Sequence, residues 1–64
     1  MMMEIDTLNR FMVSVTGAGA VRILMPPRGQ LDKEAALNLA AYLVALSDPT
    51  RERFEEVFEA ITNV

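Results

Sequence analysis

The chain has 64 residues, of which 52% are hydrophobic, and it carries a net charge of -3 with no cysteine, histidine or tryptophan. This composition excludes a disordered chain, because disorder goes with low hydrophobicity and high net charge. At this length the apolar surface that one domain can bury roughly balances the entropy lost on ordering the chain. We therefore expect a single domain, 1–64, that gains stability by associating with another copy or with a partner.

Two further features concern membranes and location. The longest apolar run, 35–46, is interrupted by Asn38 and falls well short of the roughly 20 apolar residues that a membrane-spanning helix needs. The amino end has no basic stretch followed by an apolar one, which is the pattern of a secretory signal. We expect a cytoplasmic protein that does not contact membranes.

The first elements expected are an arm and a β-hairpin. Residues 1–9 mix apolar and charged side chains without a sustained period, which predicts an irregular arm. In the stretch 10–25, apolar side chains alternate with others. Gly17 and Gly19 interrupt this alternation, and it ends at two prolines, which cannot donate to a strand ladder. This pattern predicts a hairpin with a glycine-containing turn. Its apolar face should carry Phe11, Val13, Val15, Val21, Ile23 and Met25.

A first helix is predicted over 31–46. Asp32 is placed to cap it, and Glu34 lies in the first turn, where an acidic side chain suits the helix dipole. The helix is apolar nearly all round, and a hairpin and one further helix can cover only two of its sides. We therefore expect self-association through this helix, the hairpin edge, or both. The residues expected to take part are Leu37, Leu39, Ala40, Leu43, Val44 and Leu46.

A second helix is predicted over 49–63, with Asp48 as its cap and Pro49 at its first position. An apolar face recurs at helical spacing and is formed by Phe54, Val57, Phe58, Ile61 and Val64. The short connection predicts that the two helices form an antiparallel hairpin. The expected fold class is thus α+β, a β-hairpin followed by a helical hairpin (ββαα), assembled as a dimer or a higher oligomer.

Catalytic chemistry is poorly provided for. Without histidine or cysteine the usual general base, thiolate nucleophile and soft metal ligands are missing, so we expect no enzyme, no cofactor and no metal. Four glutamates share the outer face of the second helix: Glu52, Glu55, Glu56 and Glu59. This ridge is interpreted as a solubilising surface, with an acidic docking site for a basic partner as the alternative.

Three residues are candidates for contact with a heterologous partner. Arg28 follows two prolines, which lower the ordering cost of binding. Tyr42 lies beside Asn38 on the one polar stripe of the first helix, where an amphipathic aromatic can anchor an interface. Arg22 points away from the expected apolar face of the hairpin.

Residues 21–64 have the order strand, helix, helix and in this resemble the ribbon-helix-helix repressors. The resemblance implies a dimer that reads DNA through its strands, with Arg22 as the reader and with Thr50 and Arg51 near phosphate. Against it stand a preceding strand, the outward Leu24 and a pI of about 4.6. We therefore do not expect nucleic acid to be the partner, and keep a DNA-binding dimer as the alternative.

The stretch 31–49, LDKEAALNLAAYLVALSDP, resembles segments of small phage- and prophage-encoded proteins of unknown function. The resemblance implies a bacterial cytoplasmic or viral setting and a small acidic protein that acts by binding a host protein. Together with the missing catalytic groups, it leads to the hypothesis of a non-catalytic protein-interaction module. A second alternative is a purely structural, self-assembling subunit.

Overall fold

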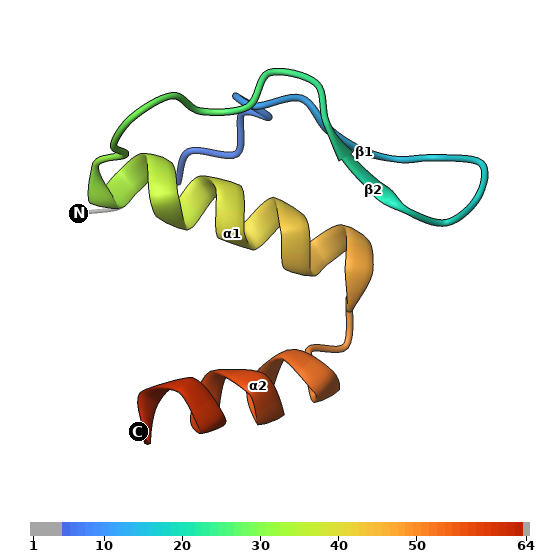
Figure 1. The fold of residues 1–64 in the computed structure, drawn as a ribbon, viewed down its shortest axis with the longest axis vertical. Helices are drawn as coiled ribbons and strands as arrows, with labels where there is room; N and C mark the ends of the chain where they lie inside the picture. The colour runs from blue at the N-terminus through green and yellow to red at the C-terminus, as the bar shows by residue number, and fades with distance from the viewer. Residues whose placement is uncertain (1–4, 64) are drawn as a thin grey trace.

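The computed structural model describes residues 5–63, which form two short strands followed by two helices (Figure 1). The strands are β1, Val13–Val15, and β2, Val21–Ile23, and the helices are α1, Lys33–Ser47, and α2, Glu52–Thr62. The expected ββαα order is confirmed. Residues 1–4 of the expected arm, and Val64 of the expected apolar face of the second helix, lie outside the described residues.

The two strands pair as an antiparallel hairpin, with Ser14 opposite Arg22 at the centre. Alternation of β-branched and other side chains favours this pleated arrangement. The ladder continues past the strands, because the backbone N–H of Met25 donates to the carbonyl oxygen of Phe11 at 3.1 Å. The predicted extent of the hairpin, up to residue 25, agrees with this longer ladder.

The turn of the hairpin depends on one of its glycines. The N–H of Gly19 donates to the carbonyl oxygen of Thr16 at 3.0 Å, and the N–H of Thr16 donates to that of Ala20 at 2.7 Å. Gly19 has a φ of +85°, a left-handed conformation that glycine adopts without a Cβ clash. This is a common hairpin connection, in which a left-handed residue follows a tight turn.

Helix α1 begins where the sequence provides a cap. The carboxylate of Asp32 accepts a hydrogen bond from the N–H of Ala35 at 2.8 Å, as predicted. The helix begins at Lys33 and ends at Ser47, close to the predicted range 31–46. At its carboxyl end the N–H of Asp48 donates to the carbonyl oxygen of Val44 at 2.7 Å.

The core lies where α1 packs against the hairpin (Figure 1). Val13 is 4% exposed and is the one buried apolar residue in the described part of the chain. Val21 and Ile23 on the same face are half-buried, as expected. Val15, expected on this face too, is 48% exposed, because the turn of the hairpin projects beyond the end of α1 (Figure 1). The core is therefore small.

Helix α2 does not join this core. It runs back in the direction opposite to α1, yet every residue from Glu52 to Thr62 is exposed (Figure 1). The radius of gyration is 13.2 Å, whereas a compact chain of this length has about 11 Å. The two helices are antiparallel and joined by a short connection, as expected, but α2 is not buried against α1 within one chain.

That connection is ordered by Asp48. Its carboxylate accepts a hydrogen bond from the N–H of Phe54 at 2.7 Å, and its carbonyl oxygen accepts one from Arg51 at 2.8 Å. Arg51 takes a left-handed φ of 64°, which redirects the chain before α2. For this reason α2 begins at Glu52 rather than at the predicted residue 49, and Pro49 belongs to the turn.

Candidate interaction surface

Two adjoining apolar hollows lie along α1. The first, of about 530 Å³, is bounded by residues 5–7 and α1. The second, of about 340 Å³, lies between α1 and α2. Leu37, Ala41 and Ala45 line both hollows. We call the two hollows together the α1 groove; these three residues form its floor, residues 5–7 one wall and the start of α2 the other.

The first wall is tied to α1 by polar contacts. The side-chain N–H of Asn38 donates to the carbonyl oxygen of Leu8 at 2.8 Å. The hydroxyl of Tyr42 donates to the backbone carbonyl oxygen of Thr7. Asn38 is 8% exposed, and its other amide atom, Oδ1, is buried without a hydrogen-bond partner. These contacts hold residues 5–8 against the helix, so the groove has a defined edge.

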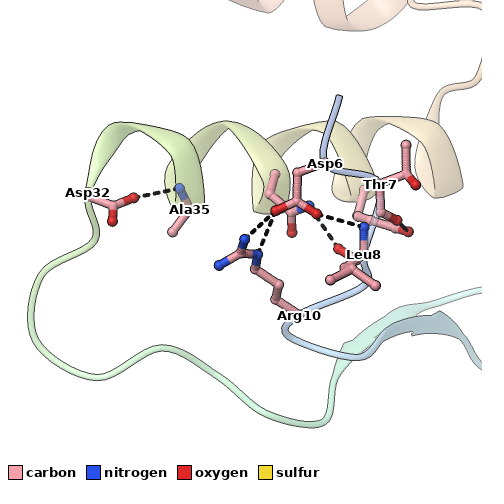
Figure 2. A network of polar contacts seen from close by, with 8 residues as sticks. Asp6, Thr7, Leu8, Arg10, Asp32 and Ala35 are labelled. Atoms are coloured by element: carbon pink, nitrogen blue, oxygen red, sulfur yellow. Dashed lines mark hydrogen bonds and ion pairs between the residues drawn. The ribbon is translucent and has the colours of Figure 1, made fainter. Parts of the chain in front are cut away.

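A local network shapes the same wall. The carboxylate of Asp6 accepts hydrogen bonds from the N–H of Leu8 at 3.0 Å and from the guanidinium of Arg10, with which it forms an ion pair (Figure 2). Both side chains of this pair are partly exposed, so the pair itself contributes little to stability. Its effect is to fix the turn that brings residues 5–8 onto α1.

Acidification should loosen this wall. The hydrogen bond from Leu8 and, after it, the one from Arg10 lower the pKa of Asp6 below its usual 3.8. Because the pKa of Asp6 is lower in the folded state, its charged carboxylate stabilises the fold above pH 3.8. This stabilisation is lost as the pH falls through the lower folded pKa. Tyr42 is the single tyrosine and there is no tryptophan, so intrinsic fluorescence reports on this wall. We expect a fluorescence change in this acid range.

The control for the pH experiment is Asp6→Asn, which cannot titrate. Its Tyr42 fluorescence should lack the transition, because the amide keeps no charge to lose. If the unchanged chain shows no transition below pH 3.8, or if Asp6→Asn shows the same one, Asp6 does not hold the wall.

The second wall leads into an uncovered apolar face on α2. The rings of Phe54 and Phe58 have centroids 5.7 Å apart, and Phe58 is 53% exposed. Ile61, one turn further along the same face, is 66% exposed. Glutamates occupy the opposite face, where an ion pair between Arg53 and Glu56 at 3.2 Å adds little stability. Removing apolar side chains of this size from water is favourable in free energy.

The total exposed area agrees with these local observations. The chain exposes 5841 Å², whereas a compact monomer of this mass exposes about 4,000 Å². The excess is about 1,800 Å², roughly twice the 800 Å² that one partner contributes to a standard protein interface. The chain therefore offers enough surface for a stable association.

The residues predicted for self-association divide into two groups. Leu37, Ala40 and Val44 line the hollows. Leu39, Leu43 and Leu46 line neither hollow, and the first two are half-buried. Sequence reasoning missed Ala41 and Ala45 on the floor. Their spacing of four residues from Leu37 was the available signal, but they share a stripe with polar Glu34, Asn38 and Tyr42.

The residues predicted for partner contact are not brought together. Arg22 lies exposed on β2, and Arg28 lies exposed in the loop before α1, and neither lines a hollow. Tyr42 does line the first hollow, but it is half-buried and its hydroxyl is bonded to Thr7. Of the three, Tyr42 alone belongs to the groove.

Residues 5–63 contain no group of three acidic side chains that could hold a metal ion, and neither of their helices is long and apolar enough to cross a membrane. Comparison with protein-family models, with curated proteins and with solved structures found no match to this chain.

Proposed function

We propose that this chain is a non-catalytic protein-interaction module, and that the α1 groove receives a helix of its partner. The observation that carries the proposal is the groove itself, two adjoining hollows of about 530 and 340 Å³ with an apolar floor that both share. Covering such a surface removes apolar area from water, which is the main driving force for protein association.

The spacing of the floor favours a helix as the bound element. Leu37, Ala41 and Ala45 are four residues apart, so they form one of the ridges along which helices pack. The alanines allow a close approach, while Leu37, 66% exposed, supplies the apolar contact. An amphipathic helix laid in an apolar groove is a recurring mode of protein recognition.

A ribbon-helix-helix DNA binder is less well supported than this proposal, and a purely structural subunit is the form of the proposal in which the partner is a second copy. A ribbon-helix-helix DNA binder would have to use β2, one edge of which is already paired with β1, and the net charge of -3 opposes contact with phosphate. A purely structural subunit would use the same groove and bind nothing but itself. A host protein, which the resemblance of 31–49 to phage-encoded segments implies, is the heterologous alternative.

Binding of a designed amphipathic helical peptide tests the proposal. The fluorescence anisotropy of the labelled peptide should rise saturably as the chain is added. Ala41→Arg places a long charged side chain on the floor of the groove and should weaken binding by at least about tenfold. The matched control is Ala18→Arg, at an exposed alanine in the hairpin turn, which should bind like the unchanged chain.

Two results would overturn the proposal. One is the absence of saturable peptide binding at concentrations where the chain is monomeric, and the other is binding that Ala41→Arg and Ala18→Arg affect equally. A parallel titration with random duplex DNA at increasing salt covers the alternative, because affinity that falls steeply with salt is the mark of a phosphate binder. Duplex binding of that kind without peptide binding would replace the proposed function by the DNA-binding one.

A further inference from the structure

We infer that the helix bound in the α1 groove is α2 of a second copy of this chain, so that two chains exchange their second helices in a symmetric dimer. This inference rests on the proposed function and names its partner. In a symmetric pair the same two surfaces meet twice, the groove of one chain with α2 of the other. Length, side-chain size and charge favour a second copy over an unrelated protein, the connection opposes closure within one chain, and the exposed area meets what a dimer needs.

The two surfaces agree in length. The floor of the groove runs from Leu37 to Ala45, which is about 12 Å along a helix. Helix α2 has 11 residues and is about 16 Å long. It is therefore long enough to cover the floor from end to end.

The surfaces also agree in side-chain size. Ala41 and Ala45 on the floor are small, whereas Phe58 and Ile61 on α2 are large and are 53% and 66% exposed. Large side chains packed over small ones bring two helices close and fill the space between them. A row of aromatic and branched residues is what the alanine floor lacks, and the same chain provides it.

The connection between the helices opposes the simplest alternative, which is closure of α2 onto α1 of its own chain. Asp48 makes three hydrogen bonds there: it donates to Val44 at 2.7 Å and accepts from Arg51 at 2.8 Å and from Phe54 at 2.7 Å. These bonds hold the turn in the conformation that leaves α2 exposed, so closure of α2 onto its own α1 would have to change that turn. A helix from another chain can enter without that change.

Charge and area favour the same occupant. The glutamates of α2, including Glu52, Glu56 and Glu59, lie on the face opposite Phe58, so they stay in water when the apolar face is covered. A strongly basic partner would be drawn to this outer face and away from the groove. The excess exposed area of about 1,800 Å² per chain exceeds the 800 Å² per partner of a standard interface.

Crosslinking through engineered cysteines tests the exchange, because the chain has no cysteine of its own. The double variant Ala41→Cys, Val57→Cys places one thiol on the floor and one on the apolar face of α2. A short bis-maleimide should convert it mainly into a covalent dimer. The matched control, Ala41→Cys with Glu56→Cys, carries its second thiol on the outer face and should crosslink at least about fivefold less.

The crosslinked products separate the possible outcomes. An internal crosslink within a monomer would show that α2 closes on its own chain and would overturn the inference. Equal dimer yields from the two double variants would overturn it as well. A chain that stays monomeric but still binds the designed amphipathic peptide would contradict the exchanged dimer and leave the proposed function supported. A chain that neither dimerises nor binds the peptide would contradict both the exchanged dimer and the proposed function.

Complementation gives a second test that does not depend on thiols. Leu37→Asp places a charge in the groove, and Phe58→Asp places one on the apolar face of α2. Each variant alone should be monomeric, because the symmetric interface contains the charge in both of its halves. Mixed together, they can form a heterodimer with one intact half, in which the groove of the second variant holds α2 of the first. Recovery of dimer in the mixture, measured by sedimentation velocity, supports the exchange; no recovery argues for contact between like surfaces.

Discussion

Replacing Leu37 by aspartate is expected to leave the monomer folded and to weaken its self-association by about a hundredfold or more. Leu37 is 66% exposed in the single chain, so the new charge meets water there and costs the fold little. In the proposed exchanged dimer the apolar face of α2 covers this position, and an unpaired charge buried against it is strongly unfavourable. Size-exclusion chromatography and circular dichroism measure the two effects separately.

The control for Leu37→Asp is Leu24→Asp. Leu24 is 49% exposed and lies on the hairpin, away from both hollows, so the same substitution should change neither fold nor association. If the two variants associate equally, Leu37 is not part of an interface. If Leu37→Asp unfolds the chain at high dilution, the side chain has a role inside the monomer that its exposure does not indicate.

Replacing Val13 by alanine is expected to lower the free energy of unfolding by about 2 kcal/mol, which combines lost burial with the cavity left behind. Val13 is 4% exposed and lies where α1 covers the hairpin, so few other side chains can compensate. Urea denaturation followed by circular dichroism measures the loss. Both proteins must be compared at one concentration, because association adds to apparent stability.

Val15→Ala is the matched control for the core. It is the same substitution in the same strand, but Val15 is 48% exposed, so the loss should be about 0.5 kcal/mol or less. Equal losses at the two positions would mean that the face of the hairpin toward α1 is not the core of the protein.

The elements that could be predicted from the sequence are those set by local chemistry. The alternation over the hairpin, the left-handed Gly19 and the cap at Asp32 each depend on residues within a few positions of one another. The order ββαα followed from them. The start of α2 was predicted too early, because the positive φ of Arg51 and the long reach of Asp48 to Phe54 leave no local signature.

The groove could be predicted only in part, because it depends on contacts between distant segments. Surplus apolar surface on the first helix was readable from its pattern. The wall formed by residues 5–7 could not be predicted, since it is held by hydrogen bonds from Asn38 and Tyr42 that span 30 and 35 positions of sequence. Nor did periodicity reveal that α2 stands away from α1, because an apolar face looks the same whether its own chain or another covers it.

Sedimentation equilibrium of the unchanged chain across the micromolar range tests whether a second copy covers the α1 groove. We expect a molar mass that rises with concentration to twice the 7.1 kDa of one chain and stops there, since a symmetric exchange of helices closes on itself. A mass of 7.1 kDa at every concentration would contradict it.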